Sequence, residues 1–359
     1  MITAPAYSTT SDDLLHPARG KTPADFFVGW GTADFADTPL FCAELCRLAY
    51  GDEPLVRACL ARVGLDLVKW LGGPRLEQRV QSWGTDGFIA VAGDGRTFMV
   101  FRGTEGDRIE DVVADLRTDD CAWATGGRVH EGFAAAFDAV AAELDTALAG
   151  RSGSLILAGH SLGAAIATLA ASMYRQRAPE LFTYGSPRVG DGDFVATLAG
   201  VQHRRHVHCC DVVPRVPPEC FDVGNVRMIV EPFGGDGFLA QITEATLANI
   251  LKLALGDPRF EHHGAPVYLS QDRTVLESPA QRAMDADQAA ARQDYSQLTA
   301  ADLSSAAGDG PHVDFLPSFR RLLSLGTAGP QLAFRDLADH APINYLGVLA
   351  ARRADVPPE

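Results

Sequence analysis

The feature that most constrains this chain is a G-x-S-x-G motif at residues 159–163. An apolar run at 154–158 precedes the motif and an alanine-rich stretch at 164–171 follows it. The run is typical of a buried parallel strand, and a helix of small residues is expected after it. A serine on the tight turn between such a strand and helix is a nucleophile elbow. We expect glycine at both Gly159 and Gly163, because a Cβ there would collide with the neighbouring strand and helix.

The segments around the motif alternate between strand-like and helix-like patterns. The expected strands are 86–92, 97–101, 154–158, 181–184 and 205–208, and the expected helices are 38–50, 55–71 and 131–148. Strands alternating with helices predict a mostly parallel central sheet with helices on both faces. The fold class is therefore α/β.

Composition excludes some classes of partner. The 359 residues include 31 Lys and Arg against 46 Asp and Glu, a net charge of -15. Phosphate binding needs cationic patches, so the sequence predicts no nucleic-acid partner. The seven cysteines form no C-x-x-C pattern. We therefore expect no metal site.

The N-terminal residues carry no apolar stretch behind a basic start. Residues 1–27 lack the core of a secretory leader, and no apolar run approaches the roughly 18 residues of a membrane span. We therefore expect no transmembrane span and a chain that is cytoplasmic or exported by a leaderless route. Residues 1–37 are expected to be a loosely packed lead-in, followed by one catalytic domain at 38–359. The sequence leaves the oligomeric state open.

A serine hydroxyl needs a base to activate it, and the base needs an acid to orient it. In this fold the three residues follow the order Ser, acid, His. Asp211 fits the acid, because it follows the strand at 205–208 and precedes a proline-rich loop. Asp191 and Asp193 are rivals, but they follow a turn that Gly185-Ser186-Pro187 already explains.

The base is expected among the histidines that follow the acid, which are His262, His263, His312 and His340. His340 stands in a loop just before the final helical stretch, where the base belongs. His262 and His263 are expected to be exposed at the end of a strand. A second oxyanion donor should come from the loop after an earlier strand, and Thr104 occupies that place. The Leu162 N–H would be the other donor.

Four blocks of the sequence resemble the class 3 lipases, the fungal-type lipase family of α/β hydrolases. They are Val100–Thr104 leading into Asp111–Leu116, Val129–Phe133, 159–164 with 183–190, and Asp211–Pro217, followed later by Asp339-His340. The resemblance implies an α/β-hydrolase fold and hydrolysis of acyl esters, commonly of glycerolipids, without a cofactor. It implies Ser161 as nucleophile, Asp211 as acid and His340 as base. It also implies Thr104 and Leu162 as the oxyanion hole, and His130 and His160 as structural supports.

The sequence also departs from that family. Val113 stands where the family usually has an aromatic residue at the start of a lid helix, and the acid and base are far apart. Residues 221–259 and 284–330 are expected to be cap or lid insertions. Within the first, an apolar helix is expected at 238–255, and it is either a mobile substrate-facing lid or a core helix. Its apolar residues include Leu239, Ile242, Ile250 and Leu251.

These observations predict a serine hydrolase that cleaves carboxylic esters through an acyl-enzyme. The favoured substrate class is acylglycerol, met at a lipid–water interface. A phospholipase A or a short-chain carboxylesterase would use the same triad. A non-catalytic α/β-hydrolase scaffold is the alternative from another functional class.

Overall fold

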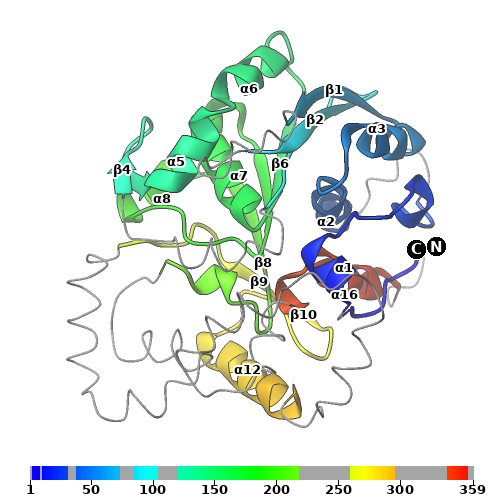
Figure 1. Ribbon diagram of the computed structural model, residues 1–359. Coiled ribbons are helices and arrows are strands. Elements are labelled where there is room, and N and C mark those ends of the chain that lie inside the picture. Colours follow the sequence, from blue (N-terminus) through cyan, green and yellow to red (C-terminus); the bar gives the residue numbers. More distant parts are fainter. Residues whose placement is uncertain are drawn as a thin grey trace.

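The structure, a computed structural model, describes residues 2–8, 10–30, 38–72, 85–103, 120–217, 259–295 and 338–354. Within them eight strands form one sheet (Figure 1). In order across the sheet they are β1 (Leu65–Leu71), β2 (Gly87–Ala92), β3 (Thr97–Phe101), β6 (Leu155–His160), β7 (Glu180–Tyr184), β8 (Gln202–His208), β9 (Pro266–Leu269) and β10 (Val275–Glu277). Strands β3, β6, β7, β8 and β9 are parallel, and the pairs at both edges are antiparallel. A separate ribbon pairs β4 (Asp120–Ala122) with β5 (Arg128–His130).

Helices cover both faces of the sheet (Figure 1). They are α1 (Ser11–Leu15), α2 (Thr38–Leu48), α3 (Glu53–Arg62), α5 (Glu131–Asp138), α6 (Ala141–Leu148), α7 (Leu162–Met173), α8 (Gly192–Thr197), α12 (Gln281–Tyr295) and α16 (Pro342–Ala354), with short 3₁₀ turns at Pro23–Asp25, Arg175–Arg177 and Val213–Arg215. Alternate strand residues enter two separate cores. Phe98 and Ile156 pack in the core with α2 and α16, whereas Met99 and Leu157 pack in the core with α5 and α7. This arrangement confirms the α/β-hydrolase fold class.

The helix expected at 55–71 is wrong beyond Arg62. Helix α3 ends there, and Gly64 adopts φ +75°, a conformation that glycine accepts readily. The chain then continues as β1, in which Leu65 and Leu71 are buried and Asp66 is exposed. Pairing with β2 stabilises this strand, so tertiary contacts override the helical spacing of its apolar residues.

The single helix expected at 131–148 is two helices, α5 and α6. They are separated at Ala139 and Val140, and Val140 has left the helical region with φ -121°. The Val140 side chain packs in the same core as Phe137 and Leu144. The break therefore turns the chain while apolar side chains on both sides of it stay buried.

The described part of the N-terminal lead-in packs against the domain. Leu14, Phe26 and Phe27 are buried, and α1 lies beside α16. The domain boundary at residue 37 stays a prediction. The expected helix at 238–255 lies outside the described residues, as do both expected insertions apart from Arg259 and residues 284–295 in α12. Among the described helices, none has the length and apolarity needed to cross a membrane.

Candidate active site

The chemistry-bearing residues converge at the carboxyl ends of adjacent parallel strands. Ser161 follows β6, Gly185 follows β7, and Asp211 lies three residues beyond the end of β8. His340 lies two residues before α16 and reaches the same edge of the sheet. Parallel strands bring these loops together, because each strand ends at the same edge.

Ser161 has the strained backbone of a nucleophile elbow. Its φ is +58° and its ψ is -128°, an uncommon conformation for a residue other than glycine. The Ser161 N–H donates to the Tyr184 carbonyl at 3.0 Å, which ties the turn to the end of β7. A Cβ on Gly159 would lie 2.2 Å from the Gly163 carbonyl oxygen, and a Cβ on Gly163 would lie 2.2 Å from that of Phe101. Both glycines are therefore required by close backbone approach, as the motif predicts.

The structure brings Asp211 and His340 into direct contact. His340 Nδ1 lies 3.0 Å from Asp211 Oδ1 and 2.9 Å from Oδ2, and both residues are buried. A carboxylate accepts hydrogen bonds, so Nδ1 carries the proton and Nε2 of the neutral ring has a free lone pair. That Nε2 is buried and has no hydrogen-bond partner among the described residues. The ring is thus in the tautomer that a general base requires.

Two further groups hold the Asp211 carboxylate in place. Tyr345 OH donates to Oδ2 at 2.7 Å, and the Val213 N–H donates to Oδ1 at 2.9 Å. Burial, followed by the charge of Asp211, raises the pKa of Tyr345 well above its usual value, so its hydroxyl stays protonated and continues to donate. Sequence reasoning missed Tyr345. Its one signal is a position five residues after His340 on the final helix.

His160 packs against His340 and binds its backbone. Its ring packs on the ring of His340 with centroids 4.6 Å apart, and its Nε2 donates to the His340 carbonyl at 2.7 Å. The Tyr50 hydroxyl therefore donates to His160 Nδ1, at 2.7 Å. Burial, followed by the nearby His340, lowers the pKa of His160 to about 3. His160 is therefore neutral near pH 7 and fixes the backbone at His340.

The buried histidines predict that stability falls as pH drops below the ordinary histidine pKa. Burial also lowers the pKa of His206 to about 3. Between roughly pH 6.5 and pH 3 these two imidazoles bind a proton in the unfolded chain but stay neutral in the folded protein. Lowering the pH therefore favours unfolding. From pH 7 to pH 5, His160 and His206 should each reduce the free energy of unfolding by on the order of 2 kcal/mol. Urea titrations of wild type and His206→Asn test this. The variant should lose less stability over that range, and an equal loss would contradict the assignment.

The rival residues have structural roles. Asp191 caps α8 by accepting from the Phe194 N–H at 2.8 Å, and Asp193 lies in the first turn of that helix. The expectation that His262 and His263 are exposed is wrong, since both are half-buried. His262 Nε2 donates to the Pro214 carbonyl at 2.7 Å, and the ring of His263 stacks on His203. These contacts with Pro214 and His203 account for the burial, and a local sequence pattern does not reveal them.

Half of the expected oxyanion hole is described. Leu162 is the first residue of α7, where N–H groups have no partner within the helix and the helix dipole favours negative charge. Gly103 lies against the elbow, because a Cβ there would lie 2.7 Å from Ser161 Cβ. Thr104 is the next residue in the chain and lies outside the described residues. So do His312 and the expected lid residues Leu239, Ile242, Ile250 and Leu251.

Gly185 sits where a side chain would push Asp211 and His340 apart. A Cβ there would lie 2.6 Å from Asp211 Oδ2 and 2.8 Å from His340 Nδ1, and the backbone φ is +60°. Gly185→Ala should lower kcat/KM by roughly 10- to 100-fold, because displacements of about 1 Å are costly at a reacting centre. Initial rates on a soluble ester measure this.

Gly150→Ala is the matched control, because Gly150 has φ +74° and a Cβ added there would meet no atom within 4 Å. It carries similar backbone strain without touching Asp211 or His340. We expect Gly150→Ala to keep its wild-type kcat/KM. Equal losses in the two variants would mean that strain, rather than displacement of the pair, reduces the rate.

Comparison with known proteins points to one family. Residues 98–221 match the model of "Lipase (class 3)". A lipase of Rhizopus niveus is 34% identical over 154 residues, which are 38% of this chain and 39% of that protein. The secreted mono- and diacylglycerol lipase 1 of Fusarium solani is 40% identical over 111 residues, 28% of this chain and 33% of that protein. The solved triacylglyceride lipase of Rhizomucor miehei aligns with a TM-score of 0.43 and 26% identity, over 52% of this chain and 76% of that one.

These matches confirm the resemblance to the class 3 lipases, whose shared segment here contains Ser161 and Asp211. The chain spans about two fifths of the length of the Rhizopus lipase that it matches. The expectation of a cytoplasmic or leaderless chain is contradicted, because the Fusarium relative is named a secreted lipase.

Proposed function

We propose that this chain, which carries the class 3 lipase segment at residues 98–221, hydrolyses carboxylic esters of acylglycerols. The observation that carries the proposal is the buried Asp211–His340 pair, with Nδ1 at 2.9 Å from the carboxylate, at the same sheet edge as the Ser161 elbow. A serine, a correctly oriented imidazole and a buried carboxylate are the parts that acyl transfer requires.

The reaction proceeds in two halves. His340 Nε2 takes the proton of the Ser161 hydroxyl as the oxygen attacks the ester carbonyl carbon, and Asp211 stabilises the imidazolium that forms. The Leu162 N–H, together with the predicted donor Thr104, stabilises the negative charge that develops on the carbonyl oxygen. The imidazolium gives its proton to the leaving alcohol, which leaves an acyl-enzyme on Ser161. A water molecule then gives a proton to His340 and attacks the acyl carbon. The bond to Ser161 Oγ breaks, the imidazolium returns its proton to that oxygen, and the fatty acid leaves.

Two observations favour acylglycerols as the substrate. The relatives are named lipases, and one is named a mono- and diacylglycerol lipase. The net charge of -15 disfavours electrostatic docking on anionic phospholipid surfaces. The acidic composition is compatible with a neutral lipid–water interface.

A comparison of substrates tests the proposal. Fatty-acid release should be measured on emulsified diacylglycerol and triacylglycerol, on phosphatidylcholine vesicles and on a short soluble ester. We expect the acylglycerols to be cleaved at least about tenfold faster than the phospholipid, a difference of about 1.4 kcal/mol in barrier. Preference for phosphatidylcholine would indicate a phospholipase A, and cleavage of the soluble ester alone a carboxylesterase. Cleavage of none of them by folded protein would indicate a binding scaffold.

A further inference from the structure

The carboxylate of Asp339, the residue before the base, joins three segments of the chain. Asp339 is fully buried, and its Oδ1 accepts a hydrogen bond from Tyr7 OH at 2.6 Å. Its Oδ2 accepts one from the backbone N–H of Cys210 at 2.9 Å. One side chain therefore connects the N-terminal segment to the residues immediately before both His340 and Asp211.

The backbone of Asp339 is tied to the same strand end. His208 Nδ1 donates to the Asp339 carbonyl at 3.1 Å. The His208 N–H donates to Tyr345 OH at 3.0 Å, and that hydroxyl donates to Asp211. The end of β8 and the loop carrying the base are thus held together by a buried hydrogen-bond network with Asp339 at one end and Asp211 at the other. In a water-poor interior, each lost donor leaves a costly unsatisfied acceptor.

The N-terminal segment is also anchored beyond the base. The Ser8 N–H donates to Asn344 Oδ1 at 2.7 Å, and Asn344 Nδ2 donates back to the Ser8 carbonyl at 2.9 Å. Asn344 Nδ2 also donates to the Ala338 carbonyl at 2.7 Å. Tyr7 and Ser8 therefore contact residues on both sides of His340, and together they hold the turn that carries it.

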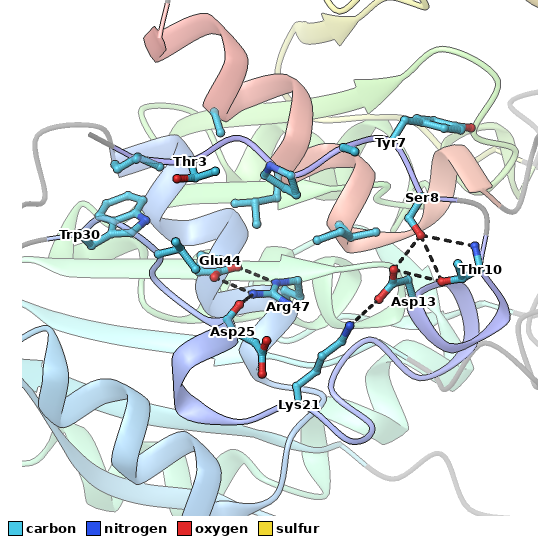
Figure 2. A pocket seen from close by; sticks show the side chains of 17 residues that line it. Thr3, Tyr7, Ser8, Thr10, Asp13, Lys21, Asp25, Trp30, Glu44 and Arg47 are labelled. Carbon is cyan, nitrogen blue, oxygen red and sulfur yellow. Dashed lines mark hydrogen bonds and ion pairs between the residues drawn. The ribbon is translucent and has the colours of Figure 1, made fainter.

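A cavity of about 420 Å³ lies between this segment and the helices α2 and α16. Figure 2 shows Tyr7 and Ser8 at one end of the cavity and Trp30 at the other, with the segment running across it past Thr3. Ile343 and Leu346, on the helix α16 that follows His340, line the cavity. Part of the segment therefore faces open space, and the hydrogen bonds of Tyr7 and Ser8 fix the end that reaches Asp339.

We propose that Tyr7 and Asp339 are positioning residues of the catalytic histidine. Tyr7 fixes the Asp339 carboxylate. Asp339 in turn fixes the distance between the loop that carries His340 and the loop that carries Asp211. Tyr7 and Ser8 are then part of the active-site support rather than of a loosely packed lead-in. This inference rests on the proposed function, because it assigns the two residues a role in the same serine hydrolase mechanism. The sequence gives no hint of it, since the two residues are 332 positions apart.

Tyr7→Phe tests the proposal by removing one hydroxyl while keeping the ring, which packs edge-on against His208 with centroids 6.3 Å apart. We expect kcat on a soluble ester to fall about tenfold with KM unchanged, because the base is displaced while substrate binding is kept. The rate at which a fluorophosphonate labels Ser161 should fall by a similar factor. Tyr174→Phe is the matched control, since Tyr174 OH donates to Asp145 at 2.8 Å in an exposed pair and should leave kcat unchanged.

Asp339→Ala provides a second variant. It removes both carboxylate oxygens, so the Tyr7 hydroxyl and the Cys210 N–H each lose their acceptor. We expect a loss of kcat at least as large as that of Tyr7→Phe. The double variant should be no slower than Asp339→Ala alone, because Tyr7 acts on His340 through the Asp339 carboxylate. Additive losses would overturn the proposal.

Hydrogen exchange of the amides at 338–345 separates the possible failures. Faster exchange in Tyr7→Phe than in Tyr174→Phe supports a role for Tyr7 in holding the base loop, and equal exchange overturns it. Wild-type kcat and labelling in Tyr7→Phe, with only a lower melting temperature, would reduce the contact to a structural one and also overturn the proposal. Wild-type protein that neither hydrolyses esters nor reacts with the fluorophosphonate would overturn the proposed function instead, while the exchange comparison still decides whether Tyr7 holds the loop.

Discussion

Ser161→Ala should lower kcat by on the order of 10³-fold or more while the protein stays folded. The substitution removes the oxygen that attacks the ester, and no other group at the elbow can replace it. Stability should change little, because alanine fits the φ +58° backbone as serine does and the Ser161 N–H keeps its bond to Tyr184. Steady-state rates on a soluble ester and a thermal melt of each protein provide the two measurements.

Ser186→Ala is the matched control for this substitution. Ser186 is also a buried serine near the same sheet edge, and its hydroxyl donates to the Pro187 carbonyl at 3.0 Å. We expect it to lose stability without a comparable loss of kcat. A folded Ser161→Ala protein with activity close to wild type would contradict the assignment of the nucleophile.

His340→Ala should cause a loss of kcat of similar size, on the order of 10³-fold, because a serine without its base is a poor nucleophile. Asp211 would then be left buried without the imidazole that it orients. The Tyr345 and Val213 donors still satisfy that carboxylate, which favours a folded variant. Single-turnover rates on an activated ester isolate the acylation step that the base accelerates.

The matched controls are His262→Ala and His263→Ala, which remove the other described histidines that follow Asp211. His262 contacts the acid loop through the Pro214 carbonyl, and His263 stacks on His203. Neither has a hydrogen bond to Asp211 in the described part of the chain. Each should retain kcat within a few-fold of wild type. Loss of activity in either one, with His340→Ala still active, would mean that this histidine, and not His340, is the base.

Local sequence patterns predicted the centre of the fold well. The glycines at 159 and 163 and the strands at 86–92, 97–101, 154–158 and 181–184 could each be recognised from a short stretch of residues, although the contact that requires Gly163 comes from Phe101. The turn at Gly64 and the break at Val140 were missed, because β1 depends on pairing with β2 and α6 on a shared core. Tertiary contacts of this kind do not appear in periodicity.

The candidate site divides in the same way. Ser161, Asp211 and His340 could be proposed from a motif and from the order of residues along the chain, and the structure places Asp211 and His340 in contact. Tyr345 and Tyr7 could not, because a buried tyrosine in a helix, or a half-buried one near the N-terminus, resembles ordinary packing until its partner is known. The oxyanion role of Thr104 and the lid at 238–255 stay predictions.

The central claim is that Ser161, activated by His340 and Asp211, forms a covalent intermediate. Labelling of the folded protein with a fluorophosphonate, followed by mass spectrometry of the intact chain and its peptides, tests this claim most directly. We expect a single adduct on wild-type protein, located on Ser161, lost in Ser161→Ala and formed much more slowly in His340→Ala. Folded wild-type protein that forms no adduct, or forms it at a residue other than Ser161, would contradict the account.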